Sequence, residues 1–491
     1  MKERIGKICD NRIVIGAVIV LVAVATAFAA SNNPLAIGRI GRDSSIFHYV
    51  ARVMKDGGMP YLDTFDHKGP LVYLIDVLGL SINEKIGVWI MELCFILIAL
   101  IYSYKLATLF GAGKKTAIVS SLVCSFTLAY YFEGGNQVEE YACTCILVSL
   151  YIFAKYFIKK SVRWYDLLLC GITCAMVCLL RINMAALWVV MCIGVLIDCI
   201  RNKKAKQLVL YLAWFLAGMA VVTLPIIIWL VSGGAWKAFL EDYFLFNFKY
   251  SSDEERASFG MFLEALVGFC RGIPVILGAV FLFHYALDRK RMFEWLCVAA
   301  LAFSLITMCI SGQSYGHYGM VLCPLITCAF AMALGEITSK EPGKEVLVTI
   351  GEKEKKYRII VIKVIVLTAL LFVISRNRPT VATEFETGLL DIAQVIKENT
   401  AEDDRIIVCG NRDCVYLQAE RKAASLYSYQ DPIAAVDEEI KNRFLQDVRS
   451  LDAAVIVVST TGTWHREVKD TLEAHYVLVK NVNGTEIYRR K

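Results

Sequence analysis

The sequence predicts a polytopic α-helical membrane domain, residues 1–375, followed by a small extracytoplasmic α/β domain, residues 376–491. Of the 491 residues, 57% are hydrophobic and 20% are charged, and the mean hydropathy is +0.54. These values are too apolar for an ordinary soluble protein. About eleven apolar runs approach the roughly 20 residues that a helix needs to cross the hydrocarbon core. Beyond residue 376 the composition becomes that of a soluble domain of a normal small size.

The first predicted membrane span, 13–30, follows a basic N-terminus and resembles a signal peptide. Ala27, Phe28 and Ala29 even imitate a cleavage site. Because the run is near the length needed to cross the membrane, we expect a retained helix. We expect further spans at 85–106, 116–132, 141–158, 166–180, 184–200, 207–231, 261–287, 294–311, 318–337 and 359–375.

Lys and Arg side chains cluster in alternate loops between these spans, and such clusters mark the cytoplasmic side of a membrane. This topology also accounts for the net charge of +6, so no nucleic-acid partner is inferred. In this topology the N-terminus lies on the inner side of a cytoplasmic membrane, taken to be bacterial, and the C-terminal domain lies on the outer side. The outer loops are then 31–84, 133–140, 232–260 and 312–317.

The apolar stretch 167–200 is interrupted at Arg181, Ile182 and Asn183. Basic clusters lie at both of its ends, which requires an even number of crossings. We therefore expect two short helices that meet near Arg181 at the outer face.

The C-terminal domain is predicted to contain strands at 405–410 and 453–458 and helices near 434–449 and 464–475. Its final hairpin turns at Asn483-Gly484, a strong type I′ signal. One interpretation of this domain is a lid or docking module without chemistry.

Most cysteines are predicted to be structural, since 14 of the 17 lie between Cys94 and Cys328, in or beside apolar spans. Thiols there behave as small hydrophobes, and their spacing does not suit a metal. Cys409 and Cys414 lie in the polar C-terminal domain, where an oxidising compartment would allow a disulfide. The sequence leaves their state open.

The first outer loop is expected to contain an amphipathic helix that lies on the membrane surface. Apolar residues recur at helical spacing from Ile46 to Met54, and Gly57-Gly58 supplies a stop. Asp43 stands at the start of this helix. Its carboxylate either caps the helix or acts as a fixed base that takes the proton of an acceptor hydroxyl, and the two roles are compatible.

Lys68 lies at the end of the polar part of the same loop. Pro70 follows it closely and suits the first turn of a second short helix. The Lys68 ammonium is expected either to hold a lipid-linked phosphate or to face the lipid headgroups.

These residues resemble the first loop of the GT-C glycosyltransferases, especially the protein O-mannosyltransferase and lipid A aminoarabinose transferase families. In those families an acidic residue at the start of the loop helix serves catalysis, a role that the resemblance implies for Asp43. Their Asp-Lys-Pro-Pro-Leu element matches residues 66–71 imperfectly, since His67 separates the acid from the lysine and Gly69 replaces the first proline. The resemblance implies a GT-C-like membrane domain, a polyprenyl-phosphate sugar donor and a phosphate contact for Lys68.

Further residues are expected to bind or orient the substrates. In GT-C proteins a second acidic loop faces the first. This resemblance suggests that Glu139 or Glu140 orients the acceptor or an optional divalent cation. The sequence does not identify the ligands of such a cation. Both acids would equally suit a helix N-terminus, where they favour the dipole. The residues assigned to this set are Asp66, Asn136, Glu139, Glu140, Tyr141, His317 and Tyr318.

Arg181 is predicted to contact the donor phosphate, because an arginine near membrane depth needs a partner or a watery cavity. The alternative is snorkelling to the outer headgroups. His317 and Tyr318 resemble a His-Tyr segment of bacterial GT-C proteins that would bond sugar or phosphate, although they also suit an interfacial aromatic belt. The aromatic-rich loop 232–260 is expected to cover the donor site, although its aromatic residues equally suit an anchor at the membrane interface.

The predicted function is inverting transfer of a sugar from a polyprenyl-phosphate carrier to a hydroxyl of an acceptor glycan, lipid or protein at the outer membrane face. Asp43 is the expected base, and Lys68 and Arg181 stabilise the departing lipid phosphate. A nucleotide-sugar donor is disfavoured because the site faces outward. Two alternatives stay open: an outer-face polymerase or ligase that uses lipid-pyrophosphate glycans, and a transporter with a soluble sensor domain.

Overall fold

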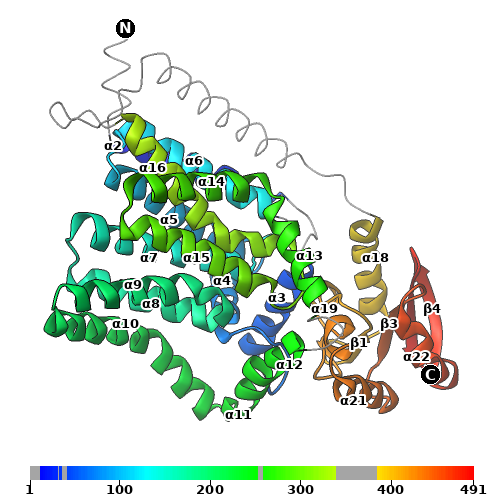
Figure 1. Cartoon of the computed structure of the whole chain (residues 1–491). Coiled ribbons are helices and arrows are strands. Elements are labelled where there is room, and N and C mark those ends of the chain that lie inside the picture. Colours follow the sequence, from blue (N-terminus) through cyan, green and yellow to red (C-terminus); the bar gives the residue numbers. More distant parts are fainter. Residues whose placement is uncertain (1–11, 31, 36–40, 253–257, 339–383) are drawn as a thin grey trace, which may run out of the picture.

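The computed structural model describes residues 12–30, 32–35, 41–252, 258–338 and 384–491. Figure 1 shows two parts: a block of helices formed by α2 to α16, and a C-terminal domain that carries the β-sheet and lies against one side of the block. Helix α3 (Arg42–Lys55) of the first outer loop and helix α19 (Cys414–Ala419) of the C-terminal domain lie where the two parts meet.

The helical block combines α-helices with short π-helical (η1, η3) and 3-10 (η2, η4) segments. In chain order after α2 (Arg12–Ala27) and α3 they are α4 (Pro70–Ile82), α5 (Gly87–Leu109), α6 (Lys114–Tyr131), α7 (Val138–Ala154), η1 (Lys155–Lys159), α8 (Trp164–Leu180), η2 (Ile182–Ala185), α9 (Ala186–Arg201), α10 (Ala205–Ser232), α11 (Trp236–Phe239), η3 (Leu240–Leu245), α12 (Phe246–Ser252), α13 (Phe259–Cys270), α14 (Ile273–Arg289), α15 (Met292–Cys309), η4 (Gly316–Leu322) and α16 (Cys323–Thr338).

Six of the described helices are long and apolar enough to cross a membrane, as in a multi-pass membrane protein. α13 and α14 together would make a seventh, but they are bent by 82°. The span predicted at 261–287 is therefore broken, and a new helix begins at Ile273 after the N-cap Gly272, with Pro274 in its first turn. The predicted count of about eleven spans is not confirmed, and the span predicted at 359–375 lies outside the described residues.

The pair of short helices predicted around Arg181 is present. α8 ends at Leu180, Arg181 has extended backbone (φ −163°, ψ 114°), and the 3-10 turn η2 leads into α9. The indole N–H of Trp188 on α9 donates to the carbonyl of Cys170 on α8 (3.3 Å), so the second helix runs back beside the first. Arg181 therefore lies at the tip of a helical hairpin.

Helix α3 differs from its prediction in two ways. It begins at Arg42, with Gly41 as its N-cap, so Asp43 lies in the first turn and the predicted capping role is wrong. Its charge there still favours the helix dipole. The helix is also not exposed on a membrane surface, because the side chains of residues 44–51 are buried.

The C-terminal domain covers one face of α3, and α4 packs against another. The Tyr49 ring packs on Tyr416 with 5.0 Å between centroids, and the Tyr49 hydroxyl accepts a hydrogen bond from the Ala423 N–H (2.7 Å). The amphipathic pattern of α3 thus belongs to a helix at an interface between two domains. Such a helix has the same hydrophobic periodicity as a helix on a membrane surface.

The C-terminal domain is built on a five-stranded sheet with the strand order β2-β1-β3-β5-β4. β1 pairs in parallel with β2 and β3, while β5 is antiparallel to β3 and β4. The elements are α18 (Glu384–Glu398), β1 (Arg405–Val408), α19, β2 (Lys422–Ala423), α20 (Asp431–Ala434), α21 (Glu438–Arg449), β3 (Val455–Ser459), α22 (Thr463–His475), β4 (Tyr476–Val482) and β5 (Thr485–Arg490).

The predicted strands, helices and hairpin of this domain are present. Asn483 and Gly484 have φ of 51° and 78°, as a type I′ turn requires. Cys409 and Cys414 are both buried, free thiols. The segment after β2 runs along the first outer loop, where the Phe65 N–H donates to the Leu426 carbonyl (2.9 Å).

A close backbone contact joins the first outer loop to the tip of the helical hairpin. The Gly69 N–H donates to the Leu180 carbonyl (3.1 Å), and a Cβ at Gly69 would lie 2.0 Å from the Leu179 carbonyl oxygen. Proline, which the related families carry at this point, would lack the N–H and add atoms where there is no space. The contact holds Lys68 near Arg181, and Pro70 then starts α4 as predicted.

We expect Gly69→Ala to lower the free energy of unfolding by about 1–3 kcal/mol, because the added methyl group must displace the end of α8. Gly16→Ala on α2 is the matched control, since nothing lies within 4 Å of a Cβ there. Thermal unfolding of the detergent-purified variants measures the difference. Equal unfolding temperatures would show that the contact does not constrain the loop.

Candidate active site

A cavity of about 370 Å³ lies between the helical block and the C-terminal domain. Its wall combines charged side chains of both signs with aromatic rings. Seven of the predicted site residues line it: Asp43, Asp66, Lys68, Glu139, Arg181, His317 and Tyr318. The structure therefore brings together residues from three separate segments of the chain and the hairpin tip.

Asp43 enters this cavity from the first turn of α3 with about a third of its side chain exposed. Its carboxylate faces His317, with 4.0 Å between Oδ2 and Nε2. The other ring nitrogen of His317 lies 2.6 Å from Glu133, which also accepts the Gly316 N–H (3.0 Å). The hydrogen bond from His317 lowers the pKa of Glu133 below its usual range. Glu133 thus fixes the imidazole that faces Asp43.

Arg181 is held by two partners from different helices. Its guanidinium donates to Glu139 (2.9 Å) and to the Tyr318 hydroxyl (3.0 Å), and its Cζ lies 4.3 Å from the centre of the Tyr318 ring. Glu139 is almost completely buried, so its charge depends on this ion pair. Among the described residues, none donates a hydrogen bond to its second carboxylate oxygen.

Lys68 lies in the cavity wall beside the inserted His67. Its ammonium is 2.6 Å from His67 Nε2, and the Tyr61 hydroxyl donates to its backbone carbonyl (2.8 Å). Burial lowers the pKa of Lys68, Asp66 opposes that shift, and the Arg181 charge adds to it. Burial also lowers the pKa of His67 well below its ordinary value, as do the charges of Lys68 and Arg181. A neutral imidazole therefore accepts the Lys68 hydrogen bond.

Asp66 is buried behind Lys68 and is fully hydrogen-bonded. Tyr73 donates to one carboxylate oxygen and Tyr429 of the C-terminal domain to the other, both at 2.7 Å. The His67 N–H adds a third bond (2.7 Å). Burial raises the pKa of Asp66, whereas Lys68 and these donors oppose the shift.

The outer loop 232–260 contributes Asn247, Tyr250 and Ser251 to the cavity wall. The His67 ring stacks on Phe246 (5.4 Å between centroids) and on Tyr250 (5.7 Å), and those two rings also contact each other (6.2 Å). Asn247 donates to the His67 carbonyl (2.6 Å). This segment therefore contacts the backbone next to Lys68.

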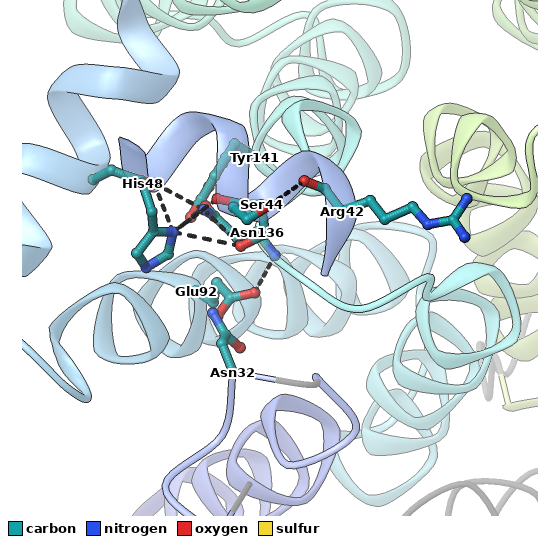
Figure 2. Close-up of polar contacts among 9 residues, drawn as sticks. Asn32, Arg42, Ser44, His48, Glu92, Asn136 and Tyr141 are labelled. Atoms are coloured by element: carbon teal, nitrogen blue, oxygen red, sulfur yellow. Dashed lines mark hydrogen bonds and ion pairs between the residues drawn. The ribbon is translucent and has the colours of Figure 1, made fainter. Parts of the chain in front are cut away.

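The structure places Asn136, Glu140 and Tyr141 outside the cavity lining, in a buried polar region. Figure 2 shows Asn136 and Tyr141 in this network. Asn136 donates to Asp76 (2.9 Å) and accepts from Tyr141 (2.6 Å), and its backbone N–H donates to Glu92. Glu140 is buried beside Glu92.

This network connects the first and second outer loops. Ser44 and His48 of α3 both contact the Asn136 side chain, at 3.2 and 3.3 Å. Gly134, Gly135 and Asn136 all have positive φ, so the second outer loop turns sharply here. Figure 2 shows Arg42, at the start of the same helix, pointing away from the network.

Sequence reasoning missed several cavity residues. Glu133 lay in a loop whose acidity was recognised, but its partner His317 is 184 positions away. Tyr429 and Asn411 come from a domain that carried no motif, and no sequence signal pointed to them. Within the described ranges there is no group of three His, Cys, Asp or Glu side chains arranged to hold a metal ion.

Two protein-family models match the chain. One, described as "Putative competence-induced protein Ccs4 N-terminal domain", covers residues 11–367, and the corresponding C-terminal domain model covers residues 389–491. The chain belongs to the Ccs4 family. No protein with a curated description matches it.

The Ccs4-family chain is similar in fold to solved membrane glycosyltransferases. ArnT from Cupriavidus metallidurans in the apo state shares 12% identity over 97% of both chains, with a TM-score of 0.62. The same protein bound to undecaprenyl phosphate gives a TM-score of 0.59 at 12% identity and the same coverage. The apo Archaeoglobus fulgidus oligosaccharyltransferase gives 0.57 at 12% identity, covering 98% of this chain and 75% of its own. This Ccs4-family protein therefore has the GT-C fold, as the sequence predicts.

We expect Arg181→Met to lower the free energy of unfolding by about 3–5 kcal/mol, because it leaves Glu139 buried without its partner. Adding Glu139→Gln should restore most of the loss. Lys237→Met is the control, since Lys237 and Glu241 are exposed and their pair contributes at most about 1 kcal/mol. Unfolding by detergent titration measures all four proteins, and equal losses in Arg181→Met and Lys237→Met would contradict a structural ion pair.

Proposed function

We propose that this protein is an inverting glycosyltransferase that moves a sugar from a polyprenyl-phosphate carrier to an acceptor hydroxyl at the outer face of the cytoplasmic membrane. The observation that carries the proposal is the convergence of one partly exposed carboxylate, Asp43, with two half-buried cations, Lys68 and Arg181, in one cavity. The GT-C fold supports it, and ArnT with the same fold was solved bound to undecaprenyl phosphate.

Asp43 is the proposed general base. An acceptor that enters through the open side of the cavity brings its hydroxyl group to the Asp43 carboxylate. The carboxylate takes the hydroxyl proton while the hydroxyl oxygen attacks the anomeric carbon of the sugar. His317, fixed by Glu133, faces Asp43 and limits how far the carboxylate can turn. The new bond forms on the face opposite the phosphate, which gives inversion.

Lys68 and Arg181 are the proposed phosphate ligands. The bond between the anomeric carbon and the phosphate oxygen breaks, and its electron pair leaves with the lipid phosphate. Two preorganised cations stabilise this developing charge most strongly where water is excluded. The Lys68 ammonium already contacts a neutral histidine, so a phosphate oxygen would replace or join that weaker partner. Because the cations stabilise the phosphate, the leaving group needs no proton.

We propose that three further residues orient the donor and do not react. Glu139 and Tyr318 act through their contacts with Arg181. Asp66 acts through the backbone that carries Lys68. The expected partners are the lipid-linked sugar, its acceptor and the membrane lipid.

We expect Asp43→Asn to lower the transfer rate by about 10²- to 10⁴-fold, the usual effect of removing a general base. Asp56→Asn, at the other end of the same helix, is the control and should retain activity. The assay incubates purified protein with labelled polyprenyl-phosphate sugars and membrane extract as the acceptor source. Equal turnover by Asp43→Asn and the parent would exclude Asp43 as the base.

A further inference from the structure

Tyr429 is a side chain of the C-terminal domain that reaches the donor side of the cavity. Its hydroxyl donates to Asp66 at 2.7 Å, across 363 positions of sequence. Tyr429 is almost completely buried and lines the cavity with its neighbour Pro432. A domain that the sequence presents as a docking module therefore supplies part of the wall.

The bond from Tyr429 acts on the backbone that carries Lys68. Asp66 also accepts the His67 N–H, so its carboxylate fixes the peptide just before the His67–Lys68 pair. On the other side, Tyr73 donates to Asp66 and lies 3.2 Å from the Lys68 carbonyl. With Tyr429 absent, the Asp66 oxygen that also accepts the His67 N–H would lose one of its two donors, which weakens the hold of this carboxylate on the loop.

We propose that Tyr429 is a positioning residue for the donor phosphate: through Asp66 it holds Lys68 in place, so the phosphate site is complete only when the C-terminal domain is docked. This inference rests on the proposed function, in which Lys68 binds a lipid phosphate. It assigns the C-terminal domain a role in donor binding that is separate from any acceptor contact.

Tyr427 provides the comparison that isolates this role. It lies two residues from Tyr429 on the same segment, and both rings pack near Phe65, at 5.3 and 6.5 Å. Tyr427 does not line the cavity. Loss of its hydroxyl should therefore leave Asp66 and Lys68 unchanged.

The coupling must also run in the reverse direction, because linkage between two binding events is reciprocal. If docking of the C-terminal domain prepares Lys68, then a phosphate bound to Lys68 stabilises the docked domain. Amide exchange in residues 426–431, next to the first outer loop, reports this effect in the unmodified protein.

The test measures binding of undecaprenyl phosphate to the full-length protein in lipid nanodiscs. Tyr429→Phe should weaken binding about tenfold, the order expected for losing one hydrogen bond to a charged group, and Tyr427→Phe less than twofold. In a Lys68→Met background, Tyr429→Phe should have no further effect, because the two residues act in series. Undecaprenyl phosphate should also slow amide exchange at 426–431 in the parent but not in Lys68→Met.

Three results would overturn the inference. Equal affinities of Tyr429→Phe and Tyr427→Phe would remove the role of the hydroxyl, and a full tenfold loss in the Lys68→Met background would show that Tyr429 acts elsewhere. Unchanged exchange in the ligand-bound parent would contradict coupling even if Tyr429→Phe failed to fold. If the parent protein bound no undecaprenyl phosphate, the proposed function itself would be contradicted. If the parent bound it and one of the three results above were found, only the role of Tyr429 would be contradicted.

Discussion

The candidate site depends on the contact between Gly69 and the end of α8. The Gly69 N–H bonds to the Leu180 carbonyl, and the absence of a side chain lets the two backbones approach this closely. Lys68 precedes this contact and Arg181 follows it, so two cations from distant parts of the chain enter one cavity. Bringing like charges together in a partly buried place is costly, and the surrounding acids and ring faces offset that cost.

Each cation has its own system of partners. Arg181 is paired with Glu139 and packed on Tyr318, which leaves it fixed and charged. Lys68 is instead next to a neutral histidine, with Asp66 behind its backbone. An anion entering the cavity would therefore find one rigid cation and one whose existing partner is weak. The pattern suits a site that must hold a phosphate and later release it.

The sequence was informative where the cause is local. Pro70 at a helix start, the type I′ turn at Asn483-Gly484 and the break at Arg181 all follow from the properties of those residues or of the charges nearby. The burial of α3 was missed because an amphipathic helix has the same pattern whether it meets a membrane or a domain. Tyr429 and the pairing of Glu133 with His317 were missed because such contacts depend on tertiary structure, over separations of 363 and 184 positions. The close approach of Gly69 to α8 was also not predicted. The sequence shows a glycine where the related motif has a proline, but it does not show which backbone lies against that glycine.

A structure of the full-length protein with undecaprenyl phosphate bound would test the central claim most directly. The account predicts the phosphate in the cavity that Asp43 lines, with oxygens at hydrogen-bond distance, about 2.7–3.2 Å, from both the Lys68 ammonium and the Arg181 guanidinium. A phosphate bound elsewhere, or in contact with neither cation, would contradict it.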